Sequence, residues 1–334
     1  MAKRTRRLSQ ADIAGRLGVS VSTVSRALAN EAGISAAVRE DVHQLARTLG
    51  YRSKRPGMGF SGRRVTAYVP LGGATSGLSG FYFGIVEGMR TTAAQAGMVL
   101  DVRLINEAAV SLDLLRHQVQ QSEAAGLLLA GIDATDEVAE WCAAADMPVV
   151  LVNGSDPLMR LNSVAPANFY GAYAATQRLL AAGHRRIVHY THQFRPTIVQ
   201  RRRGFDAAIA ATPGAEGLVV NSVECSTAEF SARLIAESYD ATALFIWNDI
   251  AAVEVLEALS GEGGHLARRY AIVGFDDLPI ASLATPRLST MHVDREAIGS
   301  AAIRLLRLQM EGERAVQQLE IGVTAVPGGT AFAL

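Results

Sequence analysis

Two groups of polar side chains in this sequence have the types and spacing needed for molecular recognition. The first is the hydroxyl-rich stretch SVSTVSR, which runs from Ser20 to Arg26. Serine and threonine hydroxyls bind phosphates and base edges, and an arginine can bind guanine through two parallel hydrogen bonds. On one exposed helix face, such residues are suited to reading the major groove of DNA.

The second group consists of amides, acids and an arginine in the rest of the chain. Asn153 follows the apolar segment VVLV, Asn248 follows LFIW and Asp276 follows IVGF, while Arg201 begins a run of three arginines. If the apolar segments are parallel strands, these side chains meet at the carboxyl edge, where open α/β sheets bind ligands. They can pair with the hydroxyls of a polar ligand. Asp276 and the adjacent Asp277 also fit a turn or a cap, and that alternative stays open.

Capping and apolar spacing around the first group predict three short helices. Ser9 and Asp12 form a predicted capping box, and Gly18 ends the first helix. Ser20 and Ser35 are the predicted caps of the next two helices. A tight turn between the first two helices makes this a helix-turn-helix, although a small helical domain whose hydroxyls only cap and solvate is the alternative. The apolar inner faces comprise Ile13, Ala14, Leu17, Val24, Ala27, Leu28, Val38, Val42, Leu45, Ala46 and Leu49.

Charge is unevenly distributed along the 334 residues. Residues 1–64 hold 13 Lys and Arg against 4 Asp and Glu, a net charge of +9, and the remainder has a net charge of −9. A small basic segment on an acidic body is typical of nucleic-acid binding, although a solvated basic tail is the alternative. The two cysteines fit a reduced compartment. Neither a signal peptide nor an apolar run of about 20 residues is evident, so we expect a cytoplasmic chain with no membrane contact.

Beyond residue 64, short apolar segments alternate with alanine-rich helical segments. This pattern predicts parallel sheets covered by helices on both faces, a doubly wound α/β fold. Eight strand segments are more than one small sheet needs, so two lobes are expected. The predicted strands are 64–71, 98–105, 125–131, 148–154, 185–191, 217–224, 242–249 and 270–277.

The stretches ADIAGRLGVSVSTVSRAL and ISAAVREDVHQLARTLGY resemble the DNA-binding head of the LacI/GalR family of bacterial transcription regulators. The resemblance implies that Val21 and Ser22, the first residues of the recognition helix, read base edges, with Arg26 behind them. Ala29 and Val38 stand where the family usually has Asn and Thr, which puts some backbone contacts in doubt but leaves the fold unchanged.

The stretch YRSKRPGMGFSG, residues 51–62, connects the predicted head to the body. In the family that it resembles, this segment forms a hinge helix on DNA and wedges an apolar residue into the minor groove. Counting from Tyr51 places that wedge at Phe60. Gly57 and Gly59 disfavour a helix, so a plain tether is the alternative. The candidate DNA contacts are Ser9, Ser20, Val21, Ser22, Thr23, Ser25, Arg26, Ser35 and Phe60.

Three segments of the body, RRRGFDAAI, ALFIWNDIAAVEVLEAL and YAIVGFDDLPIASLATPRLSTM, resemble the regulatory core of the same family. That core is similar to periplasmic sugar-binding proteins, so the resemblance implies two lobes, a hinge of crossing strands and an effector between the lobes. Ala167 and Val293 stand where the family commonly has Asp and Gln, so the identity of the ligand does not follow. Carried over by motif, the candidate effector contacts are Phe81, Tyr82, Asn153, Arg201, Asn248 and Asp276.

The predicted organisation therefore has three parts. A helix-turn-helix domain spans residues 1–51, a hinge spans 52–63 and an effector-binding and dimerisation core spans 64–334. Within the core, the N-lobe comprises about 64–162 and 292–320, and the C-lobe comprises about 163–291 and 321–334.

These observations favour a sequence-specific DNA-binding regulator, most simply a repressor, under the control of a small, sugar-like effector. The implied partners are a palindromic double-stranded operator and further copies of the chain in a homodimer or tetramer. A solute-binding protein of a transport system would share the body but needs a signal peptide and no basic head. An enzyme is disfavoured because no Walker A, G-x-S-x-G, H-E-x-x-H or C-x-x-C motif occurs, and we expect no catalytic residue, metal site or cofactor.

Overall fold

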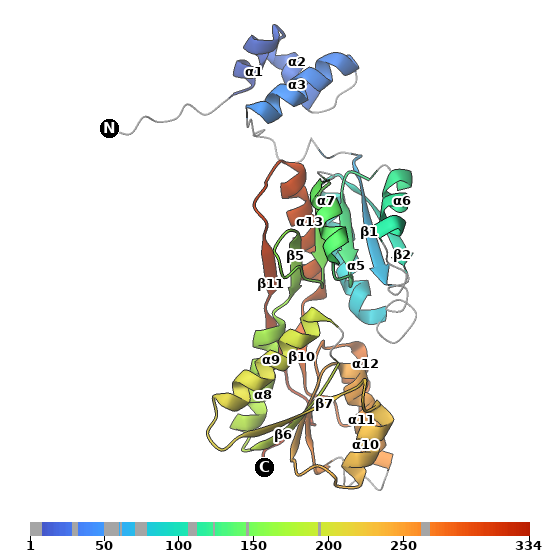
Figure 1. Cartoon of the computed structure of the whole chain (residues 1–334), viewed down its shortest axis with the longest axis vertical. Coiled ribbons are helices and arrows are strands. Elements are labelled where there is room, and N and C mark those ends of the chain that lie inside the picture. Colours follow the sequence, from blue (N-terminus) through green and yellow to red (C-terminus); the bar gives the residue numbers. More distant parts are fainter. Residues whose placement is uncertain are drawn as a thin grey trace, which may run out of the picture.

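The computed structural model describes residues 9–28, 33–49, 60, 62–70, 79–105, 112–122, 124–144, 147–192, 195–261 and 268–334. A helical head lies at one end of the molecule, followed by an upper and a lower α/β lobe (Figure 1). The predicted fold class, an all-α head with a two-lobed core of parallel doubly wound sheets, is confirmed.

The head consists of α1 (Gln10–Leu17), α2 (Val21–Leu28) and α3 (Ala36–Thr48). The predicted capping box is present, because the Asp12 carboxylate accepts hydrogen bonds from both the backbone N–H and the hydroxyl of Ser9. Gly18 ends α1 in the left-handed conformation, with φ of 66°. A compact core formed by Ile13, Ala14, Val24, Ala27, Val42 and Ala46 holds the three helices together.

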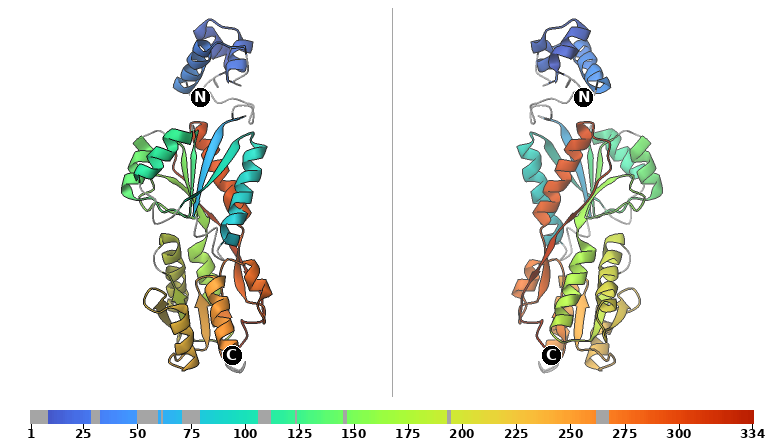
Figure 2. Two further views of the ribbon diagram at one scale, coloured as in Figure 1. Left: turned by 90° about the vertical axis from the view of Figure 1, so that its right-hand side faces the viewer. Right: turned by 90° about the vertical axis from the view of Figure 1, so that its left-hand side faces the viewer.

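The upper lobe, called the N-lobe from here on, is built on a parallel sheet with strand order β11-β5-β4-β3-β1-β2. Helices α5 and α13 cover one face of this sheet, and α6 and α7 cover the other (Figures 1 and 2). The strands are β1 (Arg64–Pro70), β2 (Val99–Ile105), β3 (Leu127–Ala130), β4 (Val149–Val152), β5 (Asn162–Pro166) and β11 (Gln318–Ile321). The helices are α5 (Ser79–Gln95), α6 (Leu112–Ser122), α7 (Asp136–Ala144) and α13 (Arg295–Met310).

The lower lobe, the C-lobe, has a parallel sheet of order β7-β6-β8-β9. Helices α8 and α9 pack on one face, and α10 and α11 pack on the other, with α12 beside α11. The strands are β6 (Arg186–Thr191), β7 (Glu216–Asn221), β8 (Ala243–Ile246) and β9 (Ala271–Val273). The helices are α8 (Asn168–Ala181), α9 (Pro196–Ala210), α10 (Thr227–Ile235), α11 (Asp249–Gly261) and α12 (Pro279–Leu283).

The chain passes between the lobes at three places. It does so from β5 to α8, from β10 (Thr290–Val293) to α13, and from β11 to β12 (Val323–Val326). Strands β10 and β12 pair antiparallel beside the C-lobe sheet. One buried apolar cluster runs through these crossings and includes residues of both lobes, so the crossing segments are part of the core.

All eight predicted strand segments contain a strand, and the structure adds β5, β10, β11 and β12. These four are short strands in or beside the lobe crossings. Among the described helices, none combines the length and apolar character that a membrane span requires.

Two glycines allow α5 and α13 to approach each other at backbone distance. A Cβ added at Gly299 would lie 2.0 Å from the carbonyl oxygen of Ile85, and one added at Gly88 would lie 2.1 Å from the carbonyl oxygen of Glu296. Both neighbours are backbone atoms, which cannot rotate away. The helix pair that supports the N-lobe therefore depends on having no side chain at this crossing.

We expect Gly299→Ala to destabilise the protein by about 1–3 kcal/mol, because the added methyl group forces the two helices apart. Thermal unfolding would show a midpoint several degrees below that of the unmodified protein. Gly261→Ala is the matched control, since a Cβ at this helical glycine has nothing within 4 Å. Equal midpoints for the two variants would contradict the close approach.

Candidate functional site

Helix α2 presents the residues expected to read DNA on one exposed face. Val24 and Ala27 point into the head and are fully buried, whereas Val21 is 47% exposed. Ser22 and Arg26 are also exposed. The residues predicted to contact base edges thus share a solvent-facing surface, which is the arrangement that major-groove recognition requires.

The hydroxyls predicted to contact phosphates cap the helices of the head. Ser20 Oγ accepts a hydrogen bond from the backbone N–H of Thr23 at 3.0 Å and lies 2.9 Å from the hydroxyl of Ser22. Ser35 Oγ accepts from the N–H of Val38 at 3.3 Å. Ser9, Ser20 and Ser35 are exposed, and Thr23 and Ser25 are partly buried. Phosphate binding by these groups stays a prediction.

Phe60, the predicted minor-groove wedge, is buried in the structure of the chain alone. Its side chain is only 7% exposed and belongs to the N-lobe core cluster, and the Arg63 guanidinium lies 5.5 Å from the centre of its ring. A wedge must be exposed to enter a DNA groove, so the predicted role requires Phe60 to leave this core, and it stays a prediction. Gly57 and Gly59 lie outside the described residues.

In the C-lobe, Arg201 forms a buried hub at the carboxyl edge of the sheet. It projects from α9, is 3% exposed, and lies over the ring of Phe275 at 3.8 Å from the ring centre. Its Nε donates to Asn168 Oδ1 at 2.8 Å, its Nη2 donates to Asp276 Oδ1 at 3.0 Å, and its Nη1 donates to the carbonyl of Trp247. Two predicted site residues, Arg201 and Asp276, are therefore directly paired.

Asp276 is held in an unusual backbone conformation, with φ of 105°, and its carbonyl accepts a hydrogen bond from Arg295 Nη1 at 2.5 Å. Burial raises the pKa of its carboxyl group, and the charge of Arg201 offsets part of that rise. Asn248, 2% exposed, caps α11 by accepting from the N–H of Ala251 at 2.9 Å, which leaves its amide N–H₂ for another partner.

Asp249 lies directly behind these residues and is fully buried. Its carboxyl group accepts a hydrogen bond from the Thr290 hydroxyl at 2.5 Å and one from the N–H of Leu278 at 2.7 Å. Burial raises the pKa of Asp249 to about 8, and the nearby charge of Asp276 contributes to the rise. Near neutral pH, Asp249 is therefore largely protonated.

On the N-lobe side, the predicted residues Asn153 and Tyr82 meet. Asn153 Nδ2 donates to the Tyr82 hydroxyl at 3.3 Å, and Asn153 itself has φ of 51° directly after β4. The Tyr82 hydroxyl packs directly against Gly131, where an added Cβ would lie 2.3 Å from the phenolic oxygen. A side chain at position 131 would therefore displace Tyr82. Phe81 stacks edge-on against Tyr82, with ring centres 5.4 Å apart, but is 5% exposed and belongs to the core cluster.

Three residues of this region were missed by the sequence reasoning: Asn168, Asp133 and Arg195. Asn168 orients Arg201, and Arg195 Nε lies 3.0 Å from Asp133 Oδ2 across the two lobes. Asp133 follows β3, so the rule that placed polar side chains after apolar strands could have found it. Arg195 precedes a helix and carries no comparable signal.

The C-lobe wall also carries polar groups without partners. Among the residues described, Thr191 Oγ1, Thr197 Oγ1 and Trp247 Nε1 are buried and make no hydrogen bond. Thr191 ends β6, Thr197 lies in the first turn of α9 and Trp247 follows β8, so all three belong to the edge that carries Arg201. The Trp247 ring stacks on His192 with ring centres 5.2 Å apart. This edge therefore carries hydrogen-bonding groups that a polar ligand could pair with, beside an aromatic ring that suits a flat or apolar ligand face.

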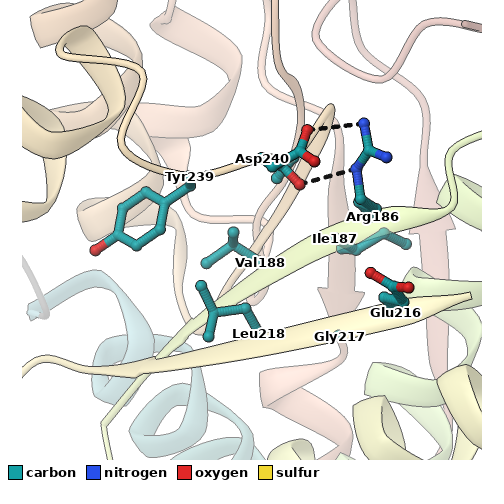
Figure 3. A pocket seen from close by; sticks show the side chains of 9 residues that line it. Arg186, Ile187, Val188, Glu216, Gly217, Leu218, Tyr239 and Asp240 are labelled. Atoms are coloured by element: carbon teal, nitrogen blue, oxygen red, sulfur yellow. Dashed lines mark hydrogen bonds and ion pairs between the residues drawn. The ribbon is translucent and has the colours of Figure 1, made fainter.

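A separate surface pocket lies at the opposite edge of the C-lobe sheet (Figure 3). Its lining includes Arg186, Glu216 and Asp240, which precede or begin the strands. It is therefore remote from the carboxyl edge that carries the predicted effector residues. Within the described ranges, no three His, Cys, Asp or Glu side chains are grouped as a metal site would require.

Known proteins resemble both parts of the chain. Residues 11–54 match the family described as "Bacterial regulatory proteins, lacI family", and residues 176–331 match the "Periplasmic binding protein-like domain". The HTH-type transcriptional regulator GntR of Pseudomonas aeruginosa is 28% identical over 309 residues, covering 90% of this chain and 89% of GntR. The regulator CelR of Thermobifida fusca is 27% identical, covering 93% of this chain and 94% of CelR.

Solved structures agree in fold. A CelR–cellobiose complex superimposes with a TM-score of 0.69 at 24% identity, covering 97% of this chain and all of the other. The lac repressor dimer bound to operator and the anti-inducer ONPF gives a TM-score of 0.68 at 22% identity, covering 98% of this chain and all of the other.

We expect Asp249→Asn to reduce the pH dependence of stability. The folded state holds the Asp249 proton up to about pH 8, whereas an unfolded aspartate releases it near pH 4, so this group's stabilising contribution is lost as pH rises between those values. Melting temperatures measured from pH 5 to pH 8 should therefore fall less steeply in the variant. Asp206→Asn, at an exposed position of α9, should keep the original slope. An unchanged slope in Asp249→Asn would rule out a buried, protonated acid.

Proposed function

We propose that this chain is a transcriptional regulator of the LacI family, most simply a repressor, that binds a specific operator, because its residues 11–54 match the family of bacterial regulatory proteins. The observation that carries the proposal is the exposed face of α2, where Val21, Ser22 and Arg26 project from a head whose inner face is buried. Its relatives are transcriptional regulators rather than enzymes, which agrees with the absence of catalytic motifs from the sequence. Chromosomal DNA as the partner implies that the protein acts in the cytoplasm.

The affinity for the operator is under the control of a small polar effector, a sugar or sugar derivative, held between the lobes. Support comes from the Arg201–Asp276 pair, the free amide of Asn248 and the unpartnered hydroxyls of Thr191 and Thr197 along one edge. A structure of similar fold, CelR, has been solved in complex with cellobiose. Hydrogen-bond donors and acceptors of this kind distinguish a hydroxylated ligand from an analogue that lacks one hydroxyl.

The functional unit is a homodimer that places two heads on a palindromic operator. Support comes from large apolar side chains that are exposed in the single chain: Phe83 on α5 at 68%, Leu104 on the edge strand β2 at 56% and Leu283 on α12 at 80%. Helices α5 and α12 are neighbours, since a Cβ at Gly80 would lie 3.8 Å from the ring of Pro279. Large apolar side chains exposed on neighbouring helices are typical of an interface.

Operator binding is tested with a palindrome from the promoter of the chain's own gene. Arg26→Ala should weaken binding by about 1–3 kcal/mol if the guanidinium reads a base, and the unmodified protein should lose affinity steeply with rising salt. Fluorescence anisotropy from 50 to 200 mM salt measures both effects. Arg178→Ala, an exposed change on α8, should bind like the unmodified chain. Absent or salt-insensitive binding would exclude the proposed function.

Effector binding is tested by a thermal-shift screen of sugars, polyols, sugar acids and nucleobases, because a ligand in the cleft raises stability by mass action. Arg201→Ala should abolish the shift produced by the best compound while operator binding is kept. Arg202→Ala, one residue along α9 and ion-paired with Asp206 in its own helix, should retain the shift. If Arg201→Ala retained it too, the site would lie elsewhere.

A further inference from the structure

One side chain of the C-lobe reaches across the cleft and binds three groups of the N-lobe. Arg195 immediately precedes α9, and each of its guanidinium nitrogens donates to the opposite lobe. Its Nε lies 3.0 Å from Asp133 Oδ2, its Nη1 lies 3.3 Å from the Tyr82 hydroxyl, and its Nη2 lies 2.6 Å from the carbonyl oxygen of Asn153. A single residue thus joins the two halves of the core.

The three acceptors come from different N-lobe elements and are held in place independently of Arg195. Asp133 follows β3 and accepts a second hydrogen bond from the N–H of Ser155 at 3.3 Å. Asn153 follows β4, and its side-chain amide donates to the hydroxyl of Tyr82 on α5. The planar guanidinium fits such a fixed set of acceptors, whereas a lysine ammonium would act as a single point charge.

The position of this contact makes it stronger than an ordinary surface ion pair. The side chains of Arg195 and Asp133 are only 22% and 24% exposed. By contrast, the Arg186–Asp240 pair lies within the C-lobe with 49% and 81% exposure, in the pocket shown in Figure 3. Charges that are partly shielded from water are screened less, and Arg195 forms two further hydrogen bonds to the same lobe.

We propose that Arg195 is an interlobe latch that sets the resting closure of the cleft from within the chain. The latch uses the Tyr82 hydroxyl oxygen and the Asn153 backbone carbonyl, which belong to two of the proposed effector contacts, so an effector hydroxyl that donates to either oxygen competes with the Arg195 hydrogen bonds. The effector therefore binds lobes that the Arg195 hydrogen bonds already hold together. The free energy that it adds to closure is that of its own contacts minus that of the Arg195 contacts it replaces. The regulatory part of this inference rests on the proposed function, whereas the latch itself does not.

The test measures the distance between the lobes in protein without added ligand. Spin labels on E140C in α7 and A174C in α8 report one lobe each, and the native Cys142 and Cys225 are both 2% exposed and so remain unlabelled. Double electron–electron resonance measures the distance between the two labels in R195M, in D133N, in the double variant and in the otherwise unmodified labelled chain. R186M is the matched control, because it removes an arginine ion pair that does not cross the cleft. Circular dichroism confirms that each variant is folded.

The latch predicts a longer and broader distance distribution in R195M and in D133N, an intermediate one in R195K, and no change in R186M. The affinities of the single and double variants for the operator palindrome supply a second readout. The operator affinity of the double variant should agree within about twofold with that of whichever single variant changes the affinity more, because both substitutions break the same contact.

Unchanged distances in both R195M and D133N would overturn the latch, as would an equal change in R186M. Additive effects of the two substitutions on operator binding would also count against it. If the distances lengthen as expected but even the unmodified chain binds no operator, the latch stands and the proposed function fails.

Discussion

The cleft side of the C-lobe is organised by the need to satisfy one buried guanidinium. Arg201 is almost completely removed from water, and a buried charge without partners would be strongly destabilising. Its acceptors come from the start of α8, the end of β8 and the loop after β9, and an aromatic ring from the same loop lies against its face. Elements distant in sequence therefore have to converge at one edge of the sheet. The parallel topology makes this possible, because it places every strand end at the same edge.

Local signals account for the parts of the structure that could be predicted from the sequence. The caps at Ser9, Ser20 and Ser35 and the apolar stripes predicted the three helices of the head, because capping and amphipathicity act within a few residues. The eight continuous apolar segments likewise predicted the central strands. Asp276 was expected at the carboxyl edge because it follows a strand, whereas its pairing with Arg201, which lies within α9, was not predicted.

The remaining features depend on contacts between distant parts of the chain. Strands β5, β10, β11 and β12 are four or five residues long, and they exist because partners far away in sequence complete their ladders. Arg195 and Asp133 are 62 residues apart, and nothing near either one predicts the other. Phe60 was assigned as a wedge by counting from Tyr51 along the family resemblance, and no local signal indicated that its ring packs into a core formed by later residues.

The burial of Phe60 limits how far the head can move from the body. Only residues 50–59 lie between the last described residue of the head, Leu49, and this anchor. Even a fully extended chain of that length spans at most about 40 Å, which is close to the roughly 35 Å between half-sites one helical turn apart. In the proposed dimer, each head can therefore move only within this distance of its own anchor at Phe60. In that proposed arrangement, binding of the first head keeps the second within tether length of its anchor and so raises its effective concentration near the other half-site.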